Sequence, residues 1–324
     1  MKKYLKTAQQ LWSGRTSNDA LYLHKKVTLI DLDLLQEDLI TAKNRAFAFL
    51  GYACDEGVRR NQGRVGAVDG ADAIRKMLGK LPHHLAATTA LYDYGTIHCH
   101  DGDLEEAQVN MALTVQRLLA YNLTPILLGG GHDIAYGHYC GIRNYVGNDK
   151  KIGILNFDAH FDLRSSANSS NSGTPFFQIA EDCKTTSASF HYLCLGIRSD
   201  ANDQKGYETA KKLKVDYIAN NQFRIENLEQ IVKEVTRFLN QIDYAYVTID
   251  LDGFSSAYAP GVSAASPMGF APDIVLEILN VILSSKKMIS LDVAEMNPKY
   301  DRDDQTAKLA ASLIHYVLHQ IDKQ

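Results

Sequence analysis

The chain has 324 residues, of which 45% are hydrophobic and 22% are charged, and its formal net charge at neutral pH is -4. This slightly acidic, mixed composition is typical of a globular protein and argues against a general nucleic-acid-binding protein. We expect no membrane-spanning segment, because no apolar stretch approaches the roughly 18 to 20 residues that cross a bilayer.

The cysteines and the N-terminal residues favour a cytoplasmic protein. The five cysteines are odd in number and form no CxxC pair, which is typical of reduced thiols. The first residues carry no apolar core of the kind that a secretory signal peptide needs.

Beyond residues 1–43, where we expect irregular structure or short helices covering the sheet, apolar runs alternate with amphipathic segments. The runs predict strands at 46–51, 91–95, 125–128, 152–157, 192–197, 217–218, 246–251 and 288–293. The amphipathic segments predict helices at 71–78, 103–121, 134–145, 205–213, 227–240, 273–283 and 304–319. Two turn-rich stretches, 55–70 and 165–173, predict loops.

This alternation predicts parallel strands joined by helical crossovers. We therefore expect an α/β fold with three layers, α/β/α, and a mostly parallel central sheet of about eight strands. We see no linker or repeat, so residues 1–324 are predicted to form a single domain.

Acidic residues and histidines follow several of these strands directly. Strand 152–157 runs into Asp158, His160 and Asp162, which would share one face of an extended chain. Strand 246–251 likewise runs into a pair of aspartates, Asp250 and Asp252. Because buried acids are costly unless they are paired or bind a cation, these clusters are hard to explain as packing.

A third strand, 125–128, runs into three consecutive glycines followed by His132. The glycines do not form the G-x-G-x-x-G dinucleotide fingerprint, although they could simply form a tight turn. Ligands of parallel sheets bind beyond the carboxyl ends of the strands, so the three clusters should meet there. The six candidate metal ligands are His132, Asp158, His160, Asp162, Asp250 and Asp252.

Six such ligands are too many for one tetrahedral zinc ion and suit two divalent ions that share bridging carboxylates. The alternative for any one aspartate is a turn residue at a strand end, where Asp is common. Glu295 follows strand 288–293 at the same edge; it could be solvated, or it could bind a cationic planar group by paired hydrogen bonds. Asp292 is a candidate supporting residue, and His138 is taken as surface or core.

As an ordered set, these motifs resemble those of the ureohydrolases, the arginase and agmatinase superfamily of two-manganese enzymes. The matching segments are 130–133, 158–162, 249–254 and 292–298. The resemblance covers roughly residues 45–320 and implies an arginase-like fold, two Mn²⁺ ions and, as in many relatives, a possible homo-oligomer.

The resemblance also implies a division of the ligands. One ion would be held by His132, Asp158, Asp162 and Asp250. The other would be held by Asp158, His160, Asp250 and Asp252, so that Asp158 and Asp250 bridge the two ions.

Four further segments, 55–61, 160–164, 172–176 and 257–264, resemble the branch that hydrolyses N-formimino-L-glutamate to L-glutamate and formamide. Arginases carry a His where this chain has Ser172 and an Asn where it has Arg164. By this resemblance, the hydroxide from a metal-bridging water attacks the amidine-type carbon. Asp162 would carry its proton to the leaving nitrogen, and Glu295 would bind the formimino N–H groups.

A substrate with two carboxylates needs cationic or polar partners. Arg164 is the first candidate, and Ser172, Asn171 and Arg60 are weaker ones. The alternatives are a guanidino-substrate ureohydrolase of the agmatinase or arginase type, and a catalytically silent metal-binding or scaffold protein. The partner that we expect is a small-molecule substrate, with no nucleic acid and no membrane.

Overall fold

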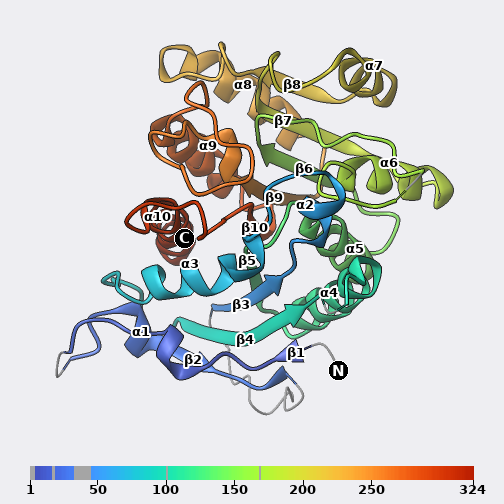
Figure 1. Ribbon diagram of the computed structural model, residues 1–324. Coiled ribbons are helices and arrows are strands. Elements are labelled where there is room, and N and C mark those ends of the chain that lie inside the picture. The colour runs from blue at the N-terminus through green and yellow to red at the C-terminus, as the bar shows by residue number, and fades with distance from the viewer. Residues whose placement is uncertain (1–3, 17–18, 33–44, 100, 168) are drawn as a thin grey trace.

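The computed structural model describes residues 4–16, 19–32, 45–99, 101–167 and 169–324. Its centre is one sheet in the order β1-β4-β3-β5-β10-β9-β6-β7-β8, with β2 also paired to β4 (Figure 1). The strands are β1 Tyr4–Leu5, β2 Val27–Leu29, β3 Ala46–Ala53, β4 Ala90–His98, β5 Thr124–Leu128, β6 Ile152–Phe157, β7 His191–Ile197, β8 Asp216–Ala219, β9 Tyr244–Asp250 and β10 Met288–Ala294.

All strand pairs are parallel except β1 with β4. The predicted α/β fold with a mostly parallel sheet is therefore confirmed. The central strands β3 and β6 are buried along their whole length, as expected for strands with helices on both faces.

Helices cover both faces of the sheet. They are α1 Leu23–Lys26, α2 Glu56–Arg60, α3 Gly70–Leu78, α4 Leu104–Ala120, α5 Ile134–Val146, α6 Pro175–Thr185, α7 Gln204–Leu213, α8 Leu228–Leu239, α9 Pro272–Ser284 and α10 Gln305–Asp322. One apolar core packs α3, α8, α9 and α10 against the sheet, and a second packs α4, α5 and α6 against the other face (Figure 1). Among the described residues, no helix combines the length and apolar character that a membrane crossing needs.

The sheet has ten strands rather than about eight, because the N-terminal region contributes two that the sequence did not predict. β1 and β2 pair with β4 at 96–97 and 91–93, so they share the outer edge of that strand instead of covering the sheet as expected. Two or three residues are too few for an alternation pattern. Of this region, residues 1–3, 17–18 and 33–44 lie outside the described residues.

Two helices were also missed. The segment 55–70, predicted to be a loop, contains α2 and a 3-10 turn at Ala67–Asp69. The helix α6 follows the predicted Ser/Asn-rich loop, and its signal was present: Pro175 stands at its first turn, with buried residues at helical spacing behind it.

A buried ion pair fixes the N-terminal segment to this sheet. Arg75 of α3 donates from Nε and Nη2 to the two carboxylate oxygens of Asp93 on β4, at 2.8 and 3.1 Å, and from Nη1 to Thr96 Oγ1 at 2.8 Å. The same carboxylate accepts from Trp12 Nε1 at 2.6 Å and from Thr7 Oγ1 at 2.8 Å. Because Arg75 and Asp93 are fully buried, neither charge has water to replace its partner.

We predict that Arg75→Met lowers the free energy of unfolding by about 3–5 kcal/mol, because it leaves the Asp93 carboxylate buried without its cation. The matched control is Arg237→Met, which breaks a half-exposed ion pair with Glu234 and should cost less than about 1 kcal/mol. Urea denaturation followed by circular dichroism measures both. Equal losses for the two variants would contradict the structural role of Arg75.

Candidate metal centre

The carboxyl ends of four neighbouring parallel strands meet at one edge of the sheet. The strands lie in the order β5-β10-β9-β6, and their register pairs Ala294 with Asp250 and Ile249 with Phe157. Three of the strands, β6, β9 and β10, end immediately before or at a polar residue of the candidate site, and three glycines separate the end of β5 from His132. The sequence prediction that these strand ends share an edge is therefore realised in the fold.

The glycine turn after β5 places His132 at this edge. Gly129 and Gly130 have φ of 64° and 86°, which disfavour residues with a side chain. There is also no room for one, because a Cβ on Gly129 would lie 2.6 Å from the Ala71 nitrogen, and one on Gly130 2.7 Å from the Tyr52 carbonyl oxygen. The turn is therefore held against neighbouring backbone, and His132, 1% exposed, is held with it.

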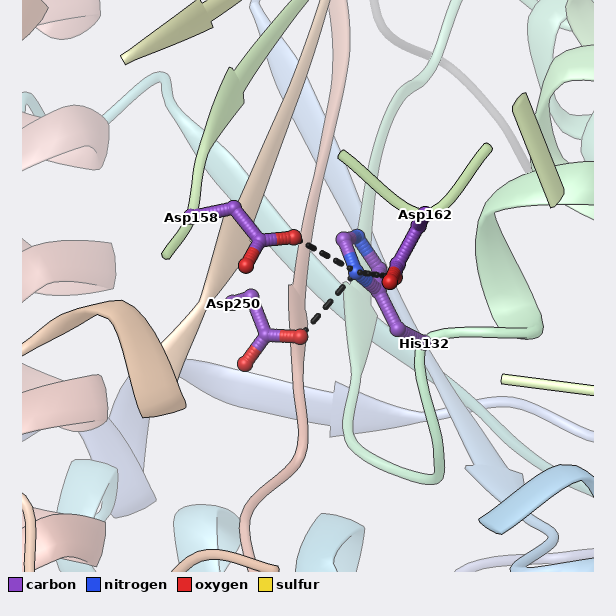
Figure 2. Close-up of side chains that lie close together, drawn as sticks. All are labelled: His132, Asp158, Asp162 and Asp250. Carbon is purple, nitrogen blue, oxygen red and sulfur yellow. Dashed lines mark ion pairs between the residues drawn. The ribbon is translucent and has the colours of Figure 1, made fainter. Parts of the chain in front are cut away.

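His132 faces three carboxylates (Figure 2). Its Nδ1 lies 3.2 Å from Asp158 Oδ2, 2.9 Å from Asp162 Oδ2 and 3.0 Å from Asp250 Oδ2. These four residues come from the loops after β5 and β6 and from the end of β9. Their ligand atoms lie within 4.8 Å of one another, close enough to hold one metal ion.

A second group adjoins the first. His160 Nδ1 lies 3.3 Å from Asp158 Oδ1 and 3.3 Å from Asp252 Oδ1, and these three residues could hold another ion. Asp158 therefore belongs to both groups, one oxygen to each, as a bridging carboxylate would. Asp250, also expected to bridge, lies in the first group, while its Oδ1 accepts a hydrogen bond from the Asp252 nitrogen.

The route by which 158–162 reaches both groups differs from the prediction. β6 ends at Phe157, so Asp158, His160 and Asp162 do not alternate on one strand face. The Asp158 carboxylate accepts a hydrogen bond from the backbone N–H of His160 at 2.7 Å, and Asp162 adopts the left-handed backbone conformation, with φ of 47°. This turn sends Asp162 to the first group and His160 to the second.

The site contains more negative charge than its histidines can balance. Burial, together with Asp252 and Asp158, raises the pKa of Asp250 well above its usual value; burial also raises the pKa of Asp252, to about 6. For His132, burial lowers the pKa, but the carboxylates around it, led by Asp250, raise it overall. These shifts indicate carboxylates that lack a positive partner.

Three buried polar atoms in the site make no hydrogen bond. They are His132 Nδ1, Asp252 Oδ1 and Glu295 Oε2. Because such atoms are rare in folded proteins, each needs an explanation. For His132 Nδ1 and Asp252 Oδ1, a bound cation would supply the missing partner. The residues present therefore fit a metal centre of mixed imidazole and carboxylate ligands.

A cavity of about 790 Å³ opens above the metal groups. Glu295 and five of the six candidate ligands line its base; Asp158 lies beneath them, fully buried. Of the predicted substrate contacts, Arg164 and Ser172 line the cavity, whereas Arg60 and Asn171 do not.

The contacts of Arg60 account for its position. Its guanidinium donates to Glu56 Oε1 at 2.8 Å, Glu105 Oε1 at 2.6 Å and the Gly102 carbonyl at 3.0 Å. Asn171 is likewise engaged, since its Oδ1 accepts from the Gly173 nitrogen at 2.9 Å. Both side chains organise the loops around the cavity.

Lys205 and Asn61 are among the residues of the cavity wall that the sequence did not predict. Lys205, in the first turn of α7, contributes a cation to the cavity wall. Asn61 holds two predicted residues, because its Nδ2 donates to Ser172 Oγ at 3.1 Å and its Oδ1 accepts from Arg164 Nη1. The polar stretch between strand 192–197 and helix 205–213 was the only sequence signal for Lys205.

Comparisons with known proteins agree with this geometry. The family model described as the arginase family matches residues 45–319. A relative named formimidoylglutamase, from Geobacillus sp. strain WCH70, is 39% identical over 322 residues, covering 97% of each chain.

Solved structures share the fold. Formimidoylglutamase from Bacillus subtilis superposes with a TM-score of 0.82 at 23% identity, covering 96% of this chain and 94% of that one. Formiminoglutamase of Trypanosoma cruzi with Mn²⁺ superposes with a TM-score of 0.77 at 22% identity, covering 88% and 97%. Since the family model spans most of the sequence and a full-length relative is 39% identical, this chain belongs to the arginase family.

Proposed function

We propose that the chain is a formimidoylglutamase, which uses water to cleave the formimino C–N bond of N-formimino-L-glutamate, giving L-glutamate and formamide. The observation that carries this proposal is the relatedness over nearly the whole chain to proteins of that name, at 37% to 39% identity in three bacterial genera. The cavity, with a candidate two-metal base and a cationic rim, is compatible with such a substrate.

The metals that we infer are two Mn²⁺ ions, the metal named for the T. cruzi structure. His132, Asp158, Asp162 and Asp250 would hold one ion, and Asp158, His160 and Asp252 would hold the other, with Asp250 at the boundary. When bound, such a pair supplies Lewis acidity that lowers the pKa of a water towards neutrality, which makes a hydroxide nucleophile available.

Glu295 is suited to orient the amidine group. Its Oε1 accepts a hydrogen bond from the backbone N–H of His132 at 2.9 Å, which fixes the carboxylate. Its Oε2 is buried without a partner at the cavity wall. The backbone of Glu295 is held in the left-handed region, φ 63°, and this conformation aims the side chain. A cationic N–H of the substrate would satisfy Oε2 by a charge-assisted hydrogen bond.

Asp162 is suited to carry the proton. It lines the cavity, and its side chain is 12% exposed, more than those of Asp158 or Asp250. A carboxylate at this position can accept a proton from the attacking water and pass it to the nitrogen that becomes the amino group of glutamate. The C–N bond then breaks, leaving formamide.

The rim would bind the two substrate carboxylates. Arg164 and Lys205 supply positive charge and Ser172 supplies a hydroxyl at the cavity wall. Agmatine has no carboxylate to use these cations, so the rim favours an acidic substrate over that amine.

We further infer a cytoplasmic, single-domain enzyme that acts on a small molecule and not on nucleic acid. The five cysteines, all among the described residues, form no disulfide, which fits a reducing compartment, and the net charge of -4 offers no general attraction to phosphate backbones. A homo-oligomer stays a prediction from the family resemblance.

The first prediction for this function concerns the substrate. With added Mn²⁺, the purified chain should release formamide and glutamate from N-formimino-L-glutamate. It should release at most a trace of urea from arginine or agmatine, because neither matches both the dicarboxylate and the formimino group. Urea release as the main activity would favour the guanidino alternative, and no turnover by the Mn²⁺-loaded protein on any of the three would favour a scaffold.

The second prediction concerns the rim. Arg164→Ala and Lys205→Ala should each raise KM about tenfold or more while leaving kcat and bound Mn²⁺ within about twofold, because each removes a charge-assisted hydrogen bond worth about 1.5–3 kcal/mol. Lys211→Ala is the matched control, since Lys211 is exposed on the same helix as Lys205 and does not line the cavity. An unchanged KM for either rim variant would remove that residue from the substrate site.

The third prediction concerns Glu295. Glu295→Gln keeps the shape of the side chain and can still accept a hydrogen bond from the backbone N–H of His132, but it removes the charge that faces the amidine. We expect kcat/KM to fall about 10²–10³-fold with unchanged Mn²⁺ stoichiometry, a loss like that of other oriented electrostatic contacts. A fall of less than threefold would exclude the proposed role.

A further inference from the structure

A chain of polar side chains lies behind His132, on the side away from the cavity. Thr248 of β9, Asp292 and Ser290 of β10, and His138 of α5 are all 0% exposed. The chain begins at His132, whose Nε2 lies 3.0 Å from Thr248 Oγ1, and Thr248 Oγ1 lies 2.5 Å from Asp292 Oδ1. It continues from Asp292 Oδ2 to His138 Nδ1, at 2.6 Å, and from His138 Nε2 to Ser290 Oγ, at 2.5 Å. No role proposed above uses this chain.

The donors can be assigned from the far end, where Ser290 Oγ lies 2.9 Å from the Pro125 carbonyl oxygen. A carbonyl only accepts, so the single proton of Ser290 goes to Pro125, and the Ser290 oxygen is left to accept from His138 Nε2. His138 Nδ1 in turn faces a carboxylate, which also only accepts when ionised. In this arrangement both ring nitrogens of His138 donate, Nε2 to Ser290 and Nδ1 to Asp292.

The assignment continues to the metal centre. Asp292 also accepts from Tyr246 OH, so Tyr246, Thr248 and His138 all donate to its carboxylate. Thr248 gives its one proton to Asp292 and can only accept from His132. The Nε2 of His132 must then carry a proton, and Nδ1 is the nitrogen whose lone pair is directed at the carboxylates of the first metal group.

We propose that Ser290, His138, Asp292 and Thr248 form a proton-ordered support that fixes His132 as the Nε2–H tautomer and presents Nδ1 to one of the two cations. The support is a set of positioning residues, and the inference rests on the metal centre of the proposed function. A partner that orients the second ring nitrogen of a metal-binding histidine commonly changes metal affinity 10–100-fold.

The support serves one metal group only. It reaches His132 through Thr248, whereas His160 of the second group has a side chain that is 24% exposed, so water can reach that ring. A general weakening of the fold would affect both ions, but loss of the support should affect the His132 ion alone. This asymmetry separates a positioning role from a merely structural one.

The test is Mn²⁺ titration calorimetry on the metal-free full chain. Thr248→Val removes the hydroxyl with little change in shape and should weaken one of two Mn²⁺ ions 10–100-fold, with the other within about threefold. Thr248→Ser should restore the wild-type affinity. The control Thr114→Val removes a buried hydroxyl that donates to the Asn110 carbonyl on α4, and it should leave both affinities unchanged.

Wild-type binding of both ions by Thr248→Val, or an equal loss of both, would overturn the inference. A second measurement decides if that variant does not fold: proton–nitrogen correlation spectra of the metal-free wild type with ¹⁵N-labelled histidines. We expect a proton on His132 Nε2 and protons on both nitrogens of His138, and a His132 protonated only at Nδ1 would overturn the inference. A wild type that binds no Mn²⁺ would instead refute the proposed function, and the spectra would still decide the tautomer.

Discussion

Crowding of like charges at one edge of the sheet is the constraint on which the rest of the structure depends. Five carboxylates meet there, of which Asp158, Asp250, Asp252 and Glu295 are buried and Asp162 is 12% exposed. Two imidazoles cannot neutralise them, and burial raises the pKa of most of these acids because water is not present to solvate the charge. Such an arrangement costs stability unless cations enter, which is why its chemistry points to a metal centre rather than to packing.

The parallel sheet makes this crowding possible. Three strand ends hold the carboxylates in fixed positions, and residues in the left-handed conformation set the final direction of two of them, Asp162 and Glu295. Strain of this kind persists only where the surrounding structure over-determines the backbone. The close packing at Gly129 and Gly130, and the buried polar chain behind His132, provide that rigidity.

Base and rim of the cavity have different tasks. In the function that we propose, the base would hold the metal ions that activate water. The rim, with Arg164, Lys205 and Ser172, would distinguish substrates by the charge they carry away from the reacting carbon. Arg60, which had looked like a rim residue, instead pairs with Glu56 within α2 and ties this helix to the start of α4 through Glu105.

The sequence by itself determined the α/β class, the eight strands from β3 to β10 and the side chains at their carboxyl ends, because apolar runs and the residues that follow them are local signals. It did not determine β1 and β2, which are strands only because the edge of β4 offers them partners. Only the tertiary structure decided that His138 reaches Asp292, 154 positions away. The same holds for Lys205, which reaches the cavity because α7 begins at its wall. The physical reason is that such contacts depend on distances between elements, and no local pattern in the chain encodes them.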